Sequence, residues 1–385
     1  MIEKPHQALL PPGMVDLLPP EAEFEARTTE RLMAAFRRNG YELIKPPLVE
    51  FEENLVTGSG AATAAQTFRL MDPDSQRMLA IRADMTIQIS RIASSRLSDL
   101  PRPLRLSYAG QVLRIKGSNL RPQRQFGQVG AELIGSGAPA ADVEIIIMTA
   151  NSLKDLGITE ISIDLGIPTL VNTICGDLGI TDEVEKIALR TALNQKDAAS
   201  ISALNAKAAS IFSVLLSAVG PVDKSLEILK KIHLSPQAER ELDHLKSVVS
   251  ELKNRAPEIS LTVDPVEIRG YEYHSYLTFT IFSKGIRGEL GRGGRYISTD
   301  SSSSDVGEMA TGVTLFIDTL LNSLPNPLTT KRMFVPLGSN EEAIQKFMSE
   351  GWIAIAELVH NPNQPKEALR LGCTHILRDG ELKKL

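Results

Sequence analysis

The main body of the chain alternates between stretches with helical and with strand-like patterns of apolar residues. From residue 21 to about residue 39 apolar positions recur at helical spacing, and the Asn39-Gly40 pair is typical of a helix end. Strand-like runs bounded by turn residues are predicted at residues 41–44, 68–71, 78–81, 104–115, 123–134, 160–165, 259–263, 276–282 and 286–290. Further helices are predicted at residues 85–93, 141–156 and 312–321, and a glycine- and serine-rich loop at residues 291–305. This order predicts an α+β body built mostly from antiparallel strands.

Two other segments interrupt or follow this body. Residues 181–255 are rich in alanine, leucine, lysine and glutamate at helical spacing, which predicts an insertion of helices at about residues 175–256. After a proline-containing linker at residues 325–327, strand and helix patterns alternate, as in a small α/β unit with parallel strands. We therefore expect two domains, residues 1–324 with the helical insertion and residues 325–385.

Composition narrows the class of protein without identifying it. The 385 residues carry 42 Lys and Arg against 47 Asp and Glu, a formal charge of −5, so no polybasic surface points to nucleic acid. Cys175 and Cys373 lie far apart and have no cysteine or histidine at ligand spacing, which excludes a disulfide framework and a zinc motif. The sequence has no apolar window long enough to span a membrane and no signal-peptide core in its first twenty residues. We expect a cytoplasmic protein.

The first candidate for chemistry is a strand-to-helix junction at residues 81–86. Asp84 and Thr86 place a carboxylate and a hydroxyl two residues apart, an arrangement that can hold a ligand ammonium group. The same residue types are also typical helix caps, because their side-chain oxygens accept hydrogen bonds from the amides of a first turn. Both interpretations, capping and ligand binding, are open at this point.

The second candidate is a pair of predicted strands joined by a polar loop. Arg114 belongs to the first strand, and Gln128 and Glu132 belong to the second. Because side chains alternate between the two faces of a strand, Phe126, Gln128, Gly130 and Glu132 share one face. An amide, a gap and a carboxylate opposite an arginine suit a ligand of amino-acid size. The alternative, an exposed sheet face, explains a charged residue but not this spacing.

Two further segments combine arginine with aromatic residues or with glycine. Residues 268–276 hold an arginine, a histidine and three tyrosines, whose polar ends would each need a partner in a core, and this favours a pocket wall. Residues 291–296 hold three glycines that allow close backbone approach to a ligand, and Arg295 is a candidate to meet an anion. A glycine-rich turn between strands explains the second segment equally well.

The order of these four segments resembles the histidyl-tRNA synthetase family, over residues 7–144 and 259–321. The resemblance implies a class II aminoacyl-tRNA synthetase-like fold, an antiparallel sheet flanked by helices, which dimerises through a first motif that ends here at Pro46-Pro47. The family's Arg-Gly-Leu-Asp-Tyr-Tyr stretch is similar to residues 269–274, and its Gly-Gly-Arg-Tyr stretch to residues 293–296. By resemblance, the histidine-binding residues correspond to Asp84, Thr86, Arg114, Gln128, Glu132, Arg269, Tyr273 and, imperfectly, His274.

Two departures from the family's pattern concern ATP. The synthetase's second motif contains Arg-x-Glu, whose glutamate helps to bind ATP, whereas this chain has Arg114-Ile115-Lys116. Its third motif ends in an arginine that holds the γ-phosphate, and here Thr319 stands in that position, with Phe316 in place of a glycine. A guanidinium that stabilises transferring phosphoryl charge contributes strongly to catalysis. We therefore expect ATP-dependent activation to be lost and the histidine pocket to be retained.

The tail also departs from a synthetase. Residues 331–385 are too short for the anticodon-binding domain that the resemblance implies, and they carry no basic stripe. A synthetase-like core with a broken ATP site and a shortened tail is similar to the ATP phosphoribosyltransferase regulatory subunits. That resemblance implies a non-catalytic subunit for the first step of histidine biosynthesis, with no catalytic residue, cofactor or metal ion of its own.

The same resemblance implies partners. They are the short-form ATP phosphoribosyltransferase catalytic subunit in a hetero-octamer, a second copy of this chain through the class II core, and L-histidine as feedback inhibitor, with no tRNA and no membrane. An active histidyl-tRNA synthetase is the alternative function, and Thr319 and Lys116 argue against it. A synthetase-like sensor of tRNA or stress is a third possibility, which the acidic charge and the short tail disfavour.

Overall fold

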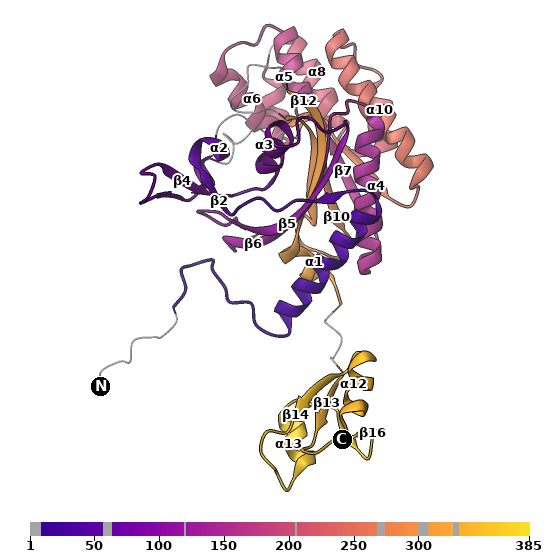
Figure 1. The fold of residues 1–385 in the computed structure, drawn as a ribbon. Helices are drawn as coiled ribbons and strands as arrows, with labels where there is room; N and C mark the ends of the chain where they lie inside the picture. Colours follow the sequence, from indigo (N-terminus) through magenta and orange to yellow (C-terminus); the bar gives the residue numbers. More distant parts are fainter. Residues whose placement is uncertain are drawn as a thin grey trace, which may run out of the picture. The chain divides into compact units, whose positions relative to one another are not determined.

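The chain divides into two compact units, Met1–Leu324 and Pro325–Leu385. The computed structural model describes residues 9–56, 64–118, 121–204, 206–267, 274–298, 307–325 and 331–385. Figure 1 traces these residues from the N-terminal segment to the C-terminal unit. Each unit has a sheet and a hydrophobic core of its own.

A mixed sheet of nine strands, counted within the described residues, forms the centre of the first unit (Figure 1). In spatial order the strands are β1 (Glu42–Leu43), β5 (Leu104–Leu113), β6 (Gln125–Ile134), β12 (Glu308–Phe316), β11 (Gly291–Ser298), β10 (His274–Ser283), β7 (Ile161–Gly166), β9 (Ser260–Asp264) and β8 (Gly220–Pro221). From β5 to β7 every neighbouring pair is antiparallel, while β1 pairs with β5 and β9 pairs with β7 in parallel. The predicted α+β, class II-like antiparallel sheet is therefore confirmed.

The two faces of this sheet carry different cores because the side chains of β6 alternate between them. Helices that pack on the sheet include α1 (Glu21–Arg38), α3 (Thr86–Ser95), α4 (Pro139–Leu156) and α11 (Ile317–Ser323). Val129 and Leu133 belong to the larger core, which Phe36 of α1 also joins. Phe126 belongs to a smaller cluster on the opposite face, together with Ile89 of α3. The candidate side chains of β6 lie on this second face.

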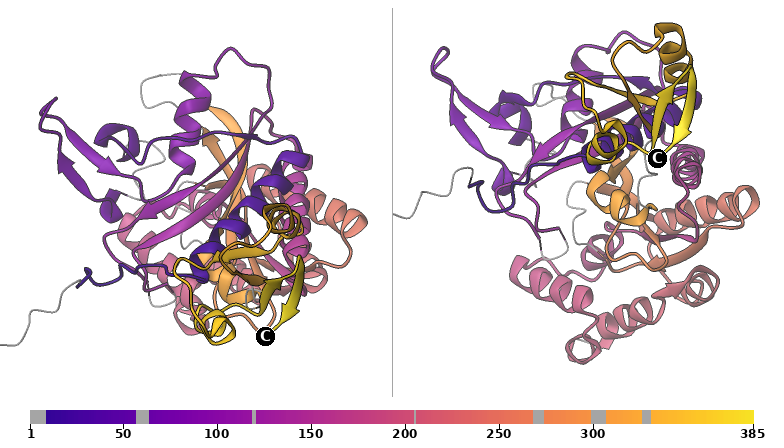
Figure 2. Two further views of the ribbon diagram at one scale, coloured as in Figure 1. Left: turned by 60° about the horizontal axis from the view of Figure 1, so that its bottom comes forward. Right: turned by 90° about the horizontal axis from the view of Figure 1, so that it is seen from below.

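The helical insertion occupies the chain between β7 and β9. Its helices are α5 (Leu170–Asp177), α6 (Glu183–Gln195), α7 (Ala198–Ser202), α8 (Ala206–Ser217), α9 (Val222–Leu229) and α10 (Pro236–Arg255). Asp182 caps α6 by accepting a hydrogen bond from the Glu185 amide, and Ser235 caps α10 in the same way. The first helix begins before residue 175, earlier than the pattern predicted. The right-hand view of Figure 2 shows the insertion gathered on one side of the unit.

A smaller, three-stranded sheet lies beside α3 (Figure 1). Its strands are β2 (Val49–Phe51), β4 (Met78–Ile81) and β3 (Arg69–Met71), and α2 (Glu52–Val56) follows β2. The turn between β3 and β4 is stabilised by Asp72, whose carboxylate accepts hydrogen bonds from the amides of Asp74 and Ser75. The hairpin predicted from residues 68–71 and 78–81 is therefore confirmed.

The C-terminal unit alternates strands and helices around a four-stranded sheet. Its elements are β13 (Arg332–Val335), α12 (Glu341–Ser349), β14 (Ile353–Ala356), α13 (Gln364–Arg370), β15 (His375–Arg378) and β16 (Glu381–Lys384). The order is β14-β13-β15-β16, with β13 parallel to both β14 and β15 and with β16 antiparallel to β15. Phe334, Ala368 and Ile376 are buried in its core. The predicted parallel strands are thus present, with an additional antiparallel strand at the edge.

Three predictions in and around the glycine-rich region are wrong. The chain from Gly291 to Ser298 is strand β11 rather than a loop, and no strand forms at residues 286–290. Residues 312–316 belong to strand β12, and helix α11 begins only at Ile317. Glycine-rich sequence is typical of loops, but here close packing requires the glycine: a Cβ at Gly293 would overlap the Gly312 carbonyl oxygen and the ring of Phe279.

Candidate functional site

Gln128 and Glu132 of β6 place two buried polar groups on the face of the sheet that α3 covers. Gln128 is fully buried and Glu132 is 1% exposed. Gly130 lies between them, and a Cβ at this position would overlap the ring of Tyr108. Glycine between Gln128 and Glu132 therefore leaves room for the Tyr108 ring of the neighbouring strand β5.

The Glu132 carboxyl accepts hydrogen bonds from three hydroxyl groups. Thr86 Oγ1 and Tyr108 OH donate to Oε1 over 3.2 and 3.1 Å, and Tyr296 OH donates to Oε2 over 3.0 Å. Burial raises the pKa of Glu132 to about 8, and the charge of nearby Asp84 also raises it, although the hydroxyl donors act in the opposite direction. Because none of these donors is cationic, a positive group on a ligand would favour the ionised carboxylate.

The junction between β4 and α3 supplies the second carboxylate. Asp84 Oδ1 accepts a hydrogen bond from the Thr86 amide over 2.9 Å, a contact to the amide two residues further on. The N-cap of α3 is Met85, which makes no side-chain cap, so Asp84 orders the approach to the helix from just before the cap position. Its other oxygen, Oδ2, accepts from Gln128 Nε2 over 3.1 Å, while Gln128 Oε1 accepts from the Met85 amide over 3.3 Å. Asp84 thus both orders the start of α3 and faces the polar groups of β6, so the two interpretations of this residue are compatible.

These residues line a pocket whose remaining walls are rich in glycine. The lining residues are Asp84, Thr86, Glu132, Arg292, Gly293, Gly294, Tyr296, Gly312, Val313 and Thr314. Gly312 is the partner of Glu132 across the β6–β12 pair, and a Cβ there would overlap the Glu132 carboxyl group. Glycine at this position is therefore what allows the carboxyl to lie across β12 and into the pocket.

Sequence reasoning did not identify the hydroxyl groups around Glu132 as part of the site. Tyr108, Tyr296 and Thr314 are involved, and Tyr108 OH also lies 2.9 Å from Thr314 Oγ1. Tyr108 and Tyr296 lie inside segments that the sequence singled out, and Thr314 shares a strand face with Gly312. Side-chain alternation along the strands could have placed these hydroxyl groups on the Glu132 face. That inference requires β11 and β12 to be recognised as paired strands, which the sequence analysis did not predict.

Arg114 lies just beyond β5 and is held at the same junction. Its Nε donates to the Ala83 carbonyl oxygen over 3.2 Å, and its guanidinium carbon lies 5.1 Å from the centre of the Phe126 ring. Burial lowers the pKa of Arg114, whereas the charge of Asp84 raises it. Five of the predicted site residues, Asp84, Thr86, Arg114, Gln128 and Glu132, are therefore brought together in one region.

The remaining predicted site residues are not placed by the structure. Arg269 and Tyr273 lie outside the described residues, and so does the side chain of His274, whose backbone begins β10. The prediction that Arg295 meets an anion is wrong. Arg295 is fully buried, and its Nη2 donates to Asp142 Oδ2 over 2.6 Å and to the Ala138 carbonyl oxygen over 2.9 Å. A carboxylate from α4 neutralises it inside the protein.

Next to the pocket, at the end of β12, aromatic and charged side chains fill the space. Arg121 stacks on the ring of Phe316, with 3.8 Å between the guanidinium carbon and the ring centre, and lies 4.9 Å from the centre of Phe126. Arg121 Nε donates to Asp318 Oδ2 over 2.8 Å and Nη2 donates to Thr319 Oγ1 over 3.2 Å. Phe316 is 1% exposed. Phe316 and Thr319, the third-motif residues that differ from the synthetase pattern, therefore both contact Arg121.

Comparison with known proteins first defines the class. A family profile described as "Histidyl-tRNA synthetase" matches residues 13–320. A solved structure from Bacillus halodurans, described as an ATP phosphoribosyltransferase regulatory subunit/histidyl-tRNA synthetase, is 25% identical and superposes with a TM-score of 0.82, covering 96% of this chain and 97% of that chain. The fold is therefore that of a class II aminoacyl-tRNA synthetase.

Curated relatives then define the family within this class. The ATP phosphoribosyltransferase regulatory subunit of Paramagnetospirillum magneticum is 49% identical over 377 residues, 98% of each chain. That of Rhodospirillum centenum is 47% identical over 381 residues, covering 99% of this chain and 97% of the relative. The chain belongs to the family of ATP phosphoribosyltransferase regulatory subunits.

The described part of the chain holds neither a metal-binding cluster nor a membrane-spanning helix. No three His, Cys, Asp or Glu side chains among these residues are grouped so that they could hold a metal ion. Among the helices in the same residues, none is both long and apolar enough to cross a membrane.

Proposed function

We propose that the chain is a non-catalytic regulatory subunit of ATP phosphoribosyltransferase that binds L-histidine in the Glu132 pocket and mediates feedback inhibition of the first step of histidine biosynthesis. The contrast between two neighbouring regions carries this proposal. The pocket keeps two carboxyl groups and glycine-lined space, whereas the adjoining third-motif region is filled by Arg121 and Phe316. A protein that retains an amino-acid pocket without the nucleotide chemistry next to it is suited to sensing.

The residues suggest how histidine is recognised. Glu132 and Asp84 pair with the ammonium and imidazole groups of the ligand, and Gln128, which is hydrogen-bonded to Asp84, orients the ligand. Thr86 supports Glu132. Arg114 meets the ligand carboxylate, since only its Nε has a described hydrogen-bond partner, the Ala83 carbonyl oxygen.

Three further residues belong to the proposed site by family resemblance only. Arg269 is a second candidate partner for the ligand carboxylate, and Tyr273 and His274 are proposed to form part of the pocket wall. Substitution of these residues would test whether the segment before β10 contributes to the affinity.

Loss of ATP-dependent chemistry follows from the same region. Thr319 offers a hydroxyl where a synthetase has the arginine that holds the γ-phosphate, and Lys116 reverses the charge of the second-motif glutamate. The ion pair of Arg121 with Asp318, with Arg121 stacked on Phe316, leaves this arginine committed to internal contacts. We therefore assign no catalytic residue and no cofactor to the chain.

The proposed assembly is a cytoplasmic hetero-octamer with the short-form catalytic subunit, without tRNA. Self-association through the class II core is supported by large apolar side chains near the start of the chain that remain exposed in the single chain: Val15, Leu17, Leu18, Leu43 and Leu48. Histidine can inhibit only if it binds two states of this assembly with different affinity, because a ligand with equal affinity for both states shifts nothing.

Reconstitution with the short-form catalytic subunit tests the proposal. Histidine is expected to inhibit phosphoribosyl transfer by the complex, and Glu132→Ala is expected to abolish the inhibition while the complex still assembles. Unchanged inhibition by the Glu132→Ala complex would contradict the assignment of the pocket. Robust histidine-dependent ATP–pyrophosphate exchange by the chain alone would instead establish the alternative, an active histidyl-tRNA synthetase.

A further inference from the structure

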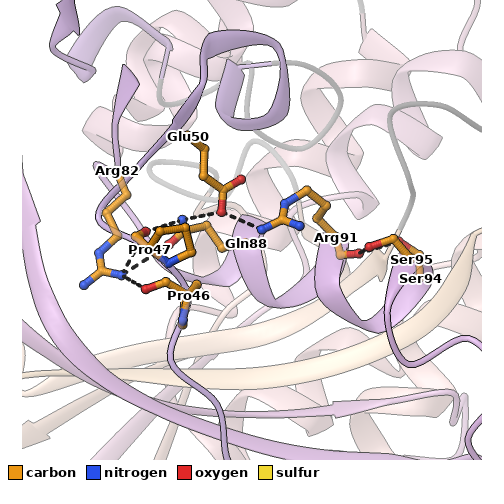
Figure 3. A network of polar contacts seen from close by, with 8 residues as sticks. All are labelled: Pro46, Pro47, Glu50, Arg82, Gln88, Arg91, Ser94 and Ser95. Carbon is orange, nitrogen blue, oxygen red and sulfur yellow. Dashed lines mark hydrogen bonds and ion pairs between the residues drawn. The ribbon is translucent and has the colours of Figure 1, made fainter. Parts of the chain in front are cut away.

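A buried polar network, drawn in Figure 3, includes residues on both sides of the junction that carries Asp84 and Thr86. It joins Arg82 at the end of β4, Gln88 and Arg91 of α3, and Glu50 of β2. Arg82 is 6% exposed, Gln88 is fully buried and Glu50 is 8% exposed. No part of this network lines the pocket, and nothing in the proposed recognition of histidine uses it.

Arg82 ties the junction to two other segments of the chain. Its Nη1 donates to the Pro46 carbonyl oxygen over 3.0 Å, and its Nε donates to the Gln111 carbonyl oxygen of β5 over 2.8 Å. Its backbone amide donates to the Leu48 carbonyl oxygen over 3.1 Å, and its own carbonyl oxygen accepts from the Leu113 amide over 3.1 Å. Side chain and backbone therefore fix this residue independently.

The guanidinium of Arg82 occupies a space that β5 leaves open for it. A Cβ at Gly110 would overlap Nη2 of Arg82 and would approach Met85 Sδ to 3.3 Å. Gly110 is also the partner of Gln128 across the β5–β6 pair. Because Gly110 has no side chain, Arg82 can lie close to β5, the strand that pairs with the Gln128 strand β6.

Gln88 completes the network with both ends of its amide. Its Oε1 lies 3.4 Å from Arg82 Nη1, and its Nε2 donates over 2.7 Å both to the Pro47 carbonyl oxygen and to Glu50 Oε1. Glu50 Oε1 also accepts from Arg91 Nη2 over 2.5 Å. Figure 3 shows Gln88 and Arg91 approaching the Glu50 carboxylate from one helix, with Arg82 and the two prolines on the other side of Gln88.

The pocket residues Asp84 and Thr86 lie between these two anchors in the sequence. Arg82 holds the chain two residues before Asp84, and Gln88 holds it two residues after Thr86. Among the described residues, two hydrogen bonds orient the Asp84 carboxylate, one from the Thr86 amide and one from Gln128. A binding constellation needs its supporting residues locked if its polar groups are to stay within about 0.5 Å of the productive geometry.

We propose that Arg82 and Gln88 are positioning residues for the effector pocket: they hold the junction so that Asp84 and Thr86 face Glu132 in the geometry that binds the ligand. This inference rests on the proposed function of the pocket. The anchors act through the backbone of the junction and through Asp84, without touching the ligand.

Calorimetric titration with L-histidine of the full chain and two variants tests the inference. Arg82→Lys keeps the charge but loses the planar fork that reaches two segments at once, and Gln88→Met keeps the length but loses every amide contact. Both are expected to bind histidine roughly ten- to a hundredfold more weakly, the range for losing a hydrogen bond to a charged group. The matched control is Arg105→Lys, whose guanidinium pairs with Glu144 instead, with affinity expected within about twofold of the wild type.

A double-mutant cycle separates positioning from a general effect on stability. If the anchors act through Asp84, then Arg82→Lys in an Asp84→Asn background should weaken binding far less than it does alone. Additive losses, or wild-type affinity in both single variants, would overturn the inference while leaving histidine binding intact. A folded wild-type chain that binds no histidine would overturn the proposed function itself, and this inference with it.

Discussion

Two adjoining stretches of strand β12 differ in whether their side chains leave or fill the space beside the strand. At Gly312 the strand has no side chain, and the Glu132 carboxyl lies in the space that this leaves. At Phe316, four residues further along and opposite Gln128, the strand carries a large ring that Arg121 covers. One stretch therefore keeps an open polar pocket, while the other has become part of the core.

The difference shows how a binding site can be retained while the chemistry beside it is removed. A pocket survives where small residues keep space and where, among the described residues, a buried carboxyl is held by hydroxyl donors rather than by a cation, as at Glu132. A neighbouring site is closed when an aromatic side chain fills it and an arginine that could meet phosphate is paired internally with Asp318. The two changes affect positions four residues apart on one strand, and we expect them to act independently.

The largest effect is expected from filling the open stretch. Gly312→Ala would place a methyl group on the Glu132 carboxyl, so histidine binding should fall by at least roughly a hundredfold, as the carboxyl is displaced. Titration calorimetry measures the loss. The matched control is Gly176→Ala in α5, where an added methyl meets no atom within 4 Å. Histidine affinity should be unchanged there, and the free energy of unfolding should rise by up to about 1 kcal/mol because alanine is favoured over glycine inside a helix. Equal histidine affinity in Gly312→Ala and Gly176→Ala would contradict the claim that the open stretch of β12 is needed for binding.

Neutralising the carboxyl should have the next largest effect. Glu132→Gln keeps the size of the side chain but removes the negative charge that a ligand cation would induce, so affinity for histidine should fall roughly ten- to a hundredfold. An affinity within about twofold of the wild type would show that Glu132 has no direct contact with a cation.

The pH dependence of stability should reveal the same carboxyl without any ligand. With a folded pKa of about 8 against a usual value of 4.5, Glu132 stays protonated in the native protein while it ionises in the unfolded chain. The unfolded state then binds fewer protons, so the free energy of unfolding decreases from about pH 4.5 to about pH 8 and is constant above. Glu132→Gln should remove this component, and thermal unfolding across this range should show its stability relative to the wild type rising with pH.

The smallest effect on the pocket is expected from the filled stretch. Phe316→Leu should remove the stacking of Arg121 and lower the free energy of unfolding by about 1 kcal/mol, as is usual for hydrophobic replacements of similar volume. Histidine affinity should stay within about twofold of the wild type. Chemical denaturation and calorimetry measure both quantities, and a large loss of affinity would show that the two stretches are coupled.

Alternation along a strand made much of the site predictable. Gln128, Gly130 and Glu132 share a face because the side-chain period of a strand is two, whatever the sheet around it. The hydrogen bond from the Thr86 amide to Asp84 was also local, since the two residues are two positions apart. The antiparallel α+β class followed from such local patterns and their order along the chain.

The parts that sequence did not reveal depend on contacts between distant segments. Position 293 of strand β11 requires glycine because the ring of Phe279 and the Gly312 carbonyl oxygen leave no room for a side chain. The local sequence pattern does not indicate either contact. Arg295 is neutralised by Asp142, which lies 153 positions earlier in the sequence. The same holds for the network of Arg82, whose partners come from three segments of the chain.

Parallel titrations of the wild-type chain with L-histidine and with ATP test the central claim most directly. One histidine is expected to bind per chain, with release of heat that depends on Glu132, and ATP is expected to give no binding and no histidine-dependent pyrophosphate exchange. Binding of ATP with exchange activity, or the absence of any histidine binding by the folded chain, would contradict the account of one open and one closed stretch.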